Sequence, residues 1–410
     1  MSIFVHAKAI VSKLVKAGYL AYFAGGWVRD YLMNNPSEDI DIATSASPME
    51  VMDLFPQTIP VGLNFGVVIV VIQGYQFEVA TFRKDLAYVD GRHPTGIELS
   101  NPKEDALRRD FTINGMFYDP IEEKIYDFVE GEKDLKLGII RTIGDPEQRF
   151  FEDRLRMLRA FRFSARFAFP IAQETKEAIY NNADKLFPAV AMERVWQEFN
   201  KMVTYPRFDQ ALIEMQRATI LQTIFPELQE MHLTRLKQIV AIYAKFPKNC
   251  PTILYLAELF AELSLEEKID IGRRLKVTNC DLKLMEYCHR LFVAIENEEE
   301  SLQNWAHLLA HTHYQLGLEV YQARLTDFAH VEFVQKMDRL FRRLKPHIRH
   351  IQAHQPIINA TYLQNLGIKP SKNLGLLLKE AEKIAIERDL HDPQAISHLL
   401  IHSVLWSQVT

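Results

Sequence analysis

Residues 21–41 read AYFAGGWVRDYLMNNPSEDID. The apolar run at 21–24 predicts a short strand, and Gly25 and Gly26 follow it directly. Two glycines between a strand and a helix let the backbone approach a phosphate group, and the N-terminus of the helix presents free N–H groups to it. Arg29 would lie on the first helical turn and face the same anion. This stretch therefore predicts a phosphate-binding turn.

The same stretch ends in two carboxylates, Asp39 and Asp41, which are separated by one residue. On a strand, residues two apart project from one face. Two carboxylates that converge there suit Mg²⁺, which takes oxygen ligands and bridges substrate phosphates. A lone Gly-Gly is more often a tight turn, and a lone Asp-x-Asp is more often a solvated strand edge. Together, at this spacing and with Arg29, they favour a site for magnesium and phosphate.

The composition is that of an ordinary globular protein. The chain has 410 residues, which suggests two or three domains, with 48% hydrophobic and 25% charged residues. The formal net charge is -5, so a nucleic-acid binder with this balance would need its basic residues clustered. The three cysteines form no CxxC pair, which excludes a disulfide framework and fits a reducing cytosol. Without a signal peptide or an apolar run of about 18 residues, we expect a soluble, cytoplasmic protein with no membrane association.

Strand patterns are concentrated at the front of the chain, and helical patterns follow. Further strands are expected at 67–72, 75–82, 125–129 and 139–143. After about residue 145 the apolar residues take helical spacing, and helices are predicted at 149–168, 173–186, 190–203 and 207–222. The chain is thus expected to be an α/β head followed by an all-helical remainder.

A second motif, RRDFTING, covers residues 108–115. Arg108 and Arg109 can neutralise a triphosphate while the carboxylate of Asp110 accepts a ribose hydroxyl. Taken alone, the motif is better explained as the start of a surface helix with mixed charges.

A third motif, EDRLRMLRAFRF, covers residues 152–163. On a single helix, Asp153, Arg156, Arg159 and Arg162 recur at every third position and form one polar ridge. Such a ridge is often a solvated helix face. A chemical alternative exists, because aspartate accepts from an exocyclic amine and arginine donates to a ring nitrogen. Cytosine and adenine both present a donor beside an acceptor, so one Asp–Arg pair accepts C and A and rejects U and G.

With these motifs, the chain resembles the bacterial class II tRNA nucleotidyltransferases (CCA-adding enzymes). This family belongs to the DNA polymerase β-like superfamily, which also includes bacterial poly(A) polymerases. The resemblance rests on GGWVRD with DID, on RRDFTING, on GEKDL at 131–135, on the arginine-rich motif at 152–162 and on ERVWQE at 193–198. Two small departures are Gly115, where alanine is usual, and Arg154, where a small residue or proline is usual. The motifs cover about the first 200 residues.

The resemblance implies an α+β fold with a polymerase β-like nucleotidyltransferase head and a small mixed β-sheet, followed by an elongated all-α neck, body and tail. The implied segments are a catalytic head at 1–140, a base-recognising neck at 141–205, a body at 206–290 and a tRNA-binding tail at 291–410.

The resemblance also implies roles for individual residues. Magnesium would bind Asp39 and Asp41, and the base would be read by Asp153 and Arg156 with support from Arg159 and Arg162. Contacts to the phosphates and the ribose would be made by Gly25, Gly26, Arg29, Arg109 and Asp110. Glu78 is either a third catalytic carboxylate or part of a structural ion pair, and the sequence leaves both open.

The implied reaction is attack of an RNA 3′-hydroxyl on the α-phosphate of CTP or ATP, with release of pyrophosphate and without a covalent enzyme intermediate. The implied partner is the tRNA 3′ end, and no obligate protein partner is evident. The product could be CCA, CC, A alone or a poly(A) tail. Residues 83–94 resemble the loop with which complete CCA-adding enzymes switch from C to A, which argues against CC alone. A catalytically inactive RNA-binding relative is a further alternative, against which the pair Asp39 and Asp41 argues.

Two downstream segments also bear on RNA binding. Residues 358–378 resemble the tail module of bacterial CCA-adding enzymes, in which a helix, a turn at Gly367 and a second helix from about Asn373 would present N–H groups to tRNA phosphate. Residues 339–350 carry five basic residues and no acid, which favours RNA contact over a solvated helix end. The dipeptide His391-Asp392 suggests an HD-type metal phosphohydrolase, but the further histidine and aspartate ligands that such an enzyme needs are not found in this sequence.

Overall fold

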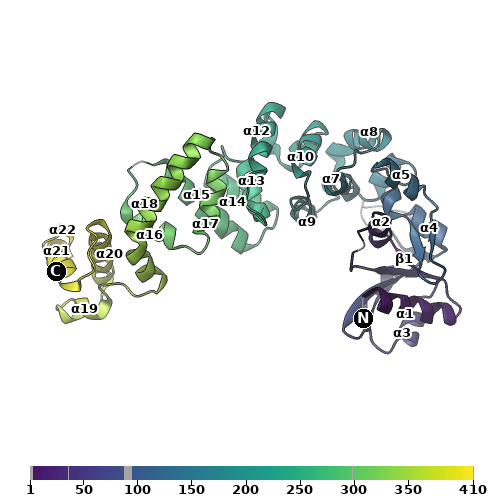
Figure 1. Cartoon of the computed structure of the whole chain (residues 1–410), viewed down its shortest axis with the longest axis horizontal. Helices are drawn as coiled ribbons and strands as arrows, with labels where there is room; N and C mark the ends of the chain where they lie inside the picture. Colours follow the sequence, from purple (N-terminus) through teal and green to yellow (C-terminus); the bar gives the residue numbers. More distant parts are fainter. Residues whose placement is uncertain (1–2, 36, 87–94, 298, 410) are drawn as a thin grey trace. The chain divides into compact units, whose positions relative to one another are not determined.

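The computed structural model describes residues 3–35, 37–86, 95–297 and 299–409 (Figure 1). The chain forms two compact units, Met1–Lys237 and Gln238–Thr410. In the described ranges, no helix combines the length and the apolar character that crossing a membrane requires. The predicted α+β class, with a sheet at the front and helices after it, is confirmed. The finer division into head, neck, body and tail stays a prediction.

The head of the first unit is a seven-stranded mixed sheet with the order β3-β4-β5-β2-β1-β8-β9. Strands β2 and β5 pair in parallel, with Ile42 opposite Val79, and the other neighbours are antiparallel. This register places Asp41 and Glu78, one residue earlier on each strand, side by side. The strands are β1 (Ala21–Ala24), β2 (Asp41–Thr44), β3 (Thr58–Gly62), β4 (Val67–Ile72), β5 (Tyr75–Thr81), β8 (Phe117–Asp119) and β9 (Lys124–Tyr126).

Alternating side chains of β1 pack on opposite faces of this sheet, as the period of a strand requires. Phe23 belongs to the larger core cluster, whereas Tyr22 belongs to a second cluster on the other face. Helices α1 (Ile3–Lys16) and α3 (Pro48–Leu54) lie together on the first face (Figure 1). The second face is covered in part by α4 (Pro102–Leu107), whose Ala106 joins the second cluster.

Two short strands, β6 (Arg83–Asp85) and β7 (Ile97–Leu99), pair with each other beside the main sheet. The segment 83–94, which resembles a switching loop, begins with β6 and ends shortly before β7. Residues 87–94 of that segment lie outside the described residues. The described part therefore gives the loop a base made of two paired strands.

The strand predicted at 139–143 is wrong, because this segment makes only two isolated bridges, Phe111 to Thr142 and Ile140 to Ile171. Its backbone groups bond to scattered loop residues instead of one neighbouring strand. The amide of Thr112 donates to the carbonyl of Arg141, and the amide of Ile140 donates to the carbonyl of Pro170. Glycines with positive φ at both ends, Gly138 and Gly144, turn the chain before a ladder can extend.

Helices make up the rest of the first unit. The single helix predicted at 149–168 is wrong, because it is interrupted at Asp153, where the backbone is extended. The helix predicted at 207–222 is likewise divided at Thr219, whose φ is +59°. The helices are α2 (Gly26–Leu32), α5 (Gly131–Leu137), α6 (Pro146–Glu152), α7 (Leu155–Phe167), α8 (Gln173–Asn182), α9 (Met192–Met202), α10 (Phe208–Arg217) and α11 (Ile220–Ile224), with 3₁₀ turns at Leu63–Phe65, Thr112–Asn114, Ala183–Lys185 and Pro226–Leu228. The next helix, α12 (Leu233–Tyr243), contains the boundary between the two units.

In its described residues, the second unit consists of helices joined by turns and loops, without a strand (Figure 1). The predicted helix, Gly367 turn and second helix are confirmed, since α20 begins at Lys372 and Gly367 has φ +94°. Leu363, Leu377 and Leu400 join these C-terminal helices in one buried cluster. The helices are α13 (Thr252–Leu259), α14 (Leu265–Arg274), α15 (Asn279–Glu296), α16 (Leu302–Ala310), α17 (Tyr314–Gln322), α18 (Asp327–Gln352), α19 (Ala360–Asn365), α20 (Lys372–Glu387), α21 (Pro393–Ile401) and α22 (Val404–Val409).

Candidate active site

A cavity of about 550 Å³ in the first unit collects nearly all of the sequence-predicted site residues. Nine arginines and four carboxylates line it, so its surroundings carry a net positive charge that suits a triphosphate. Asp39 is the predicted residue that does not line it. The predicted residues that do are Gly25, Gly26, Arg29, Asp41, Glu78, Arg109, Asp110, Asp153, Arg156, Arg159 and Arg162.

The predicted phosphate turn begins at Gly25, whose φ of +67° and ψ of −127° favour glycine. A Cβ atom at this position would lie 3.0 Å from Nη1 of Arg109, and one at Gly26 would lie 3.4 Å from Nη2 of Arg29. The two glycines therefore leave room for the arginine side chains on which the site depends.

Asp41 is the first residue of β2 and lies beside Glu78 of β5. Burial, followed by the neighbouring carboxylates of Glu78 and Asp39, raises the pKa of Asp41 to about 6, against the opposing effect of Arg109. Asp39 is exposed and precedes the strand, so the expectation that both aspartates project from one strand is wrong. The strand is shorter than expected and begins only at Asp41.

These three carboxylates fit a magnesium ion by their chemistry. They offer hard oxygen ligands, which Mg²⁺ prefers, and their mutual repulsion is what a divalent cation would relieve. Glu78 is exposed at this end of the cavity. The prediction that its strand neighbours that of Asp41 is confirmed by the parallel pairing of β2 and β5.

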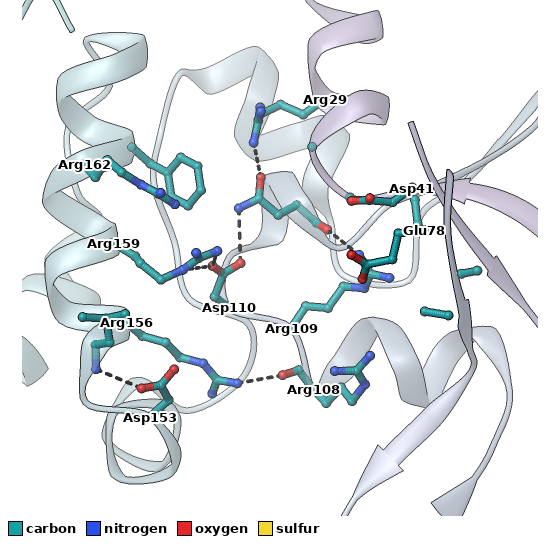
Figure 2. A pocket seen from close by; sticks show the side chains of 18 of the residues that line it. Arg29, Asp41, Glu78, Arg108, Arg109, Asp110, Asp153, Arg156, Arg159 and Arg162 are labelled. Carbon is teal, nitrogen blue, oxygen red and sulfur yellow. Dashed lines mark hydrogen bonds and ion pairs between the residues drawn. The ribbon is translucent and has the colours of Figure 1, made fainter. Parts of the chain in front are cut away.

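Asp110 lies at the centre of a buried hydrogen-bond network (Figure 2). Its carboxylate accepts from Nε of Arg159 at 2.7 Å, from Nδ2 of Asn114 at 3.2 Å and from the amide of Phe111 at 2.8 Å. Burial alone would raise the pKa of Asp110, but Arg159 and Asn114 outweigh it and lower this pKa to about 2. Since protein donors already occupy the carboxylate, accepting a ribose hydroxyl would require one of these bonds to be exchanged.

Asn114 connects this network to the phosphate turn. Its side-chain oxygen accepts from Nη1 of Arg29, while its nitrogen donates to Asp110. Arg29 is 2% exposed and also donates from Nε to Asp30 at 2.8 Å. Asp30 in turn accepts from Arg166 at 2.9 Å. Arg29 is thereby held in one orientation between α2 and α7.

Asp153 and Arg156 both line the cavity but do not share a helix as predicted. Asp153 follows the last residue of α6 and accepts from the amide of Leu155 at 3.1 Å, which fixes the interruption. Arg156 lies in α7, where Nη1 donates to Glu152 at 2.7 Å and Nη2 donates to the carbonyl of Arg108 at 2.9 Å. The carboxylate of Asp153 pairs instead with Arg194, at 3.4 Å.

The sequence interpretation missed several residues of the cavity. Asn114 lies inside the RRDFTING motif, and Arg194 lies inside the ERVWQE motif, but neither was assigned a role. Arg166 continues the helical spacing of Arg159 and Arg162, so the motif could have been extended by one turn. Arg162 is buried against Glu198, at 3.2 Å, a contact across helices that no local pattern indicates.

Comparisons with known proteins identify the family of the chain. Residues 21–141 match the family described as Poly A polymerase head domain, and residues 168–231 match the one described as Probable RNA and SrmB-binding site of polymerase A. The CCA-adding enzyme of Anoxybacillus flavithermus is 44% identical over 226 residues, which are 55% of this chain and 56% of that enzyme. This match thus spans little more than half of the relative.

Two further comparisons extend over nearly the whole chain. The CCA-adding enzyme of Ligilactobacillus salivarius is 32% identical over 388 residues, which cover 93% of this chain and 91% of that enzyme. The solved structure of the Bacillus stearothermophilus CCA-adding enzyme in complex with CTP superposes with a TM-score of 0.79 at 26% identity, over 98% of each chain. By its sequence, its fold and its arginine-lined cavity, the chain belongs to the family of CCA-adding enzymes.

Proposed function

We propose that this chain is a magnesium-dependent tRNA nucleotidyltransferase that adds CCA to the 3′ end of tRNA in the cytoplasm, using CTP and ATP and releasing pyrophosphate. The observation that carries the proposal is that the carboxylates Asp41 and Glu78 and an arginine-rich wall line the same cavity. The acids suit the metal, and the arginines suit the triphosphate and the base. The relatives described above support the choice of substrates.

Asp41 is proposed to hold magnesium together with Asp39, with Glu78 as a third carboxylate. When bound, the ion would lower the pKa of the attacking 3′-hydroxyl and neutralise charge on the leaving oxygens. Asp39 is exposed and does not line the cavity, but it is close enough for its charge to raise the pKa of Asp41. Glu78 lines the cavity next to Asp41.

Arg29 and Arg109 are proposed to bind the phosphates beside Gly25 and Gly26. Arg29 is oriented by Asp30 and Asn114, and Arg109 by Asp105, whose Oδ2 accepts from Nη2 of Arg109 at 2.9 Å. Arginines fixed in this way lose little further conformational freedom when a nucleotide binds.

Asp153 and Arg156 are proposed to read the base. Asp153 would accept from the exocyclic amine of C or A, and Arg156 would donate to the adjacent ring nitrogen. Three bonds from Arg156 to the protein are described, so donors of its five-donor guanidinium remain for a base. Because Asp153 is paired with Arg194, a base must compete with that arginine or share the carboxylate with it.

The reaction product distinguishes this proposal from the two alternative functions, which are addition of A alone and poly(A) synthesis. Three tRNA transcripts, ending at the discriminator base, at C and at CC, are incubated with CTP and ATP separately and together. The proposal expects two C from CTP on the first transcript, one C on the second, one A on the third, and CCA with both nucleotides. Extension of only the third transcript would instead identify an A-adding enzyme, and continued A addition would identify a poly(A) polymerase.

A further inference from the structure

The second unit contains a cluster of side chains that the proposed function does not use. His347, Asp389 and His391 each offer one metal-ligand atom, and these atoms all lie within 4.8 Å of one another. Within the described ranges of the chain, this is the one group of three His, Cys, Asp or Glu side chains whose ligand atoms lie that close together. The carboxylates Asp39, Asp41 and Glu78 of the first unit are not part of it.

The cluster joins two elements that are distant in the sequence. His347 lies on α18, directly after Pro346, and is only 3% exposed. Asp389 and His391 lie in the connection between α20 and α21, where both are exposed. A ligand bound by all three would therefore fasten the end of α18 to the C-terminal helices.

The two distances to the aspartate are close to those between ligands of a small tetrahedral ion. Nε2 of His347 lies 3.1 Å and Nε2 of His391 lies 3.4 Å from the same oxygen, Oδ1 of Asp389. For an ion with ligands at about 2.0–2.1 Å, neighbouring ligand atoms are about 3.3–3.4 Å apart. The two imidazole rings lie nearly parallel, at 28° and with centroids 4.8 Å apart, and both direct Nε2 toward Oδ1 of Asp389.

Asp389 occupies its position at a cost to the backbone. Its φ is +52°, in the left-handed region where glycine is preferred after a helix. The amide of Leu390 donates to the carbonyl of Ala385 at 2.8 Å, which completes the turn at the end of α20. The turn itself requires no carboxylate, and the side chain of Asp389 contacts both histidines.

We propose that His347, Asp389 and His391 form a binding site for a divalent transition-metal ion, with Zn²⁺ as the best match. Two imidazoles and one carboxylate are a ligand set that zinc commonly takes, whereas Mg²⁺ prefers oxygen ligands alone. Three protein ligands leave a fourth position for water. The alternative is a hydrogen-bonded cluster in which both rings donate to Asp389 without a metal.

The test uses the full-length, untagged chain, stripped with EDTA and returned to excess Mg²⁺ so that oxygen-ligand sites stay filled. Zn²⁺ is titrated by calorimetry, and thermal unfolding is followed with and without it. The site predicts one equivalent bound by the wild type and a rise in the melting temperature. Co²⁺ as a second probe should give the visible absorption typical of a four-coordinate ion.

Two variants separate the metal site from a hydrogen-bonded cluster. Asp389→Asn keeps a hydrogen-bond acceptor and tolerates the left-handed backbone, but it removes the charged ligand. His391→Ala removes an exposed ligand, so it should fold. Loss of an outer-shell partner typically weakens metal binding roughly 10- to 100-fold, so loss of a direct ligand should weaken Zn²⁺ binding at least about 100-fold. His330→Ala, which removes an exposed histidine of the same helix, is the matched control and should bind Zn²⁺ as the wild type does.

The proposal is overturned if the wild type takes up no Zn²⁺ in the presence of Mg²⁺. It is also overturned if Asp389→Asn or His391→Ala keeps the wild-type Zn²⁺ affinity. Nucleotide addition is not the readout, so a failure here leaves the proposed function of the first unit untouched.

Discussion

Replacing Asp41 by asparagine should make the metal-free chain more stable while it abolishes nucleotide addition. Asparagine has nearly the same shape as aspartate and carries no charge. The pKa of Asp41 is raised from its ordinary value of 3.8 to about 6, first by burial and then by Glu78 and Asp39. The folded chain therefore holds this carboxylate in its charged form at a cost that the variant does not have.

The size and sign of the effect follow from the two pKa values. A difference of about two pH units between folded and unfolded chains corresponds to about 3 kcal/mol, as an upper estimate. Because the pKa is higher in the folded chain, protonation favours folding. The cost is absent below about pH 4, develops between about pH 4 and 6, and is complete above that. At pH 5 the expected gain from Asp41→Asn is about half of its value at pH 7.5.

Urea unfolding in EDTA at pH 7.5 and at pH 5 measures this directly. Glu38→Gln serves as the control. Glu38 is an exposed neighbour of the site, so this substitution also removes one negative charge but no buried one. Adding Mg²⁺ should stabilise the wild type more than Asp41→Asn, since the ion offsets the repulsion between the carboxylates. If Asp41→Asn were no more stable than the wild type at pH 7.5 in EDTA, Asp41 would not be the strained carboxylate that the metal site requires.

Three further predictions test other parts of the site. Burial opposes the charge of Asp110, but Arg159 and Asn114 outweigh it and lower the pKa of Asp110 from 3.8 to about 2. Asp110→Asn should therefore cost about 2–3 kcal/mol, because it removes the charge that pairs with the partly exposed guanidinium of Arg159. The wild type should lose this contribution as the pH falls below about 4, and identical acid unfolding of the two proteins would refute the pairing. Asp153→Ala should admit UTP and GTP, and its discrimination against these nucleotides should be roughly 10- to 100-fold weaker than that of the wild type, since a mispaired buried polar group costs about 1–3 kcal/mol. Strict exclusion of UTP by this variant would show that the base is read elsewhere. Deletion of 87–94, which spares β6 and β7, should leave C addition intact and abolish A addition in a primer-extension assay; equal loss of both steps would make the segment structural.

Local patterns predicted the parts of the fold that depend on neighbouring residues. The strand at 21–24, the glycine turn and the strands at 67–72 and 75–82 follow from alternation and from glycine punctuation. The turn at Gly367 was predictable for the same reason. These are the elements that carry Gly25, Gly26 and Glu78 into the cavity.

Contacts between distant segments could not be predicted in this way. The interruption at Asp153 arises because its side chain bonds the amide of Leu155 and its carboxylate pairs with Arg194, about forty residues later. The helical spacing of Asp153, Arg156, Arg159 and Arg162 shows no break at Asp153, so the sequence pattern predicted one continuous helix. In the same way, no local pattern indicates that Arg29 donates to Asn114, because the two residues lie in separate segments 85 residues apart.

The most direct test of the central claim compares the wild type with Asp41→Asn on a tRNA transcript that ends at the discriminator base. Both proteins receive CTP, ATP and Mg²⁺, the 3′ ends are sequenced, and tRNA binding is measured in parallel. The proposed site predicts that the wild type adds CCA and stops, and that the variant binds tRNA with near wild-type affinity but adds essentially nothing. Normal CCA addition by Asp41→Asn, or a wild-type product other than CCA, would contradict it.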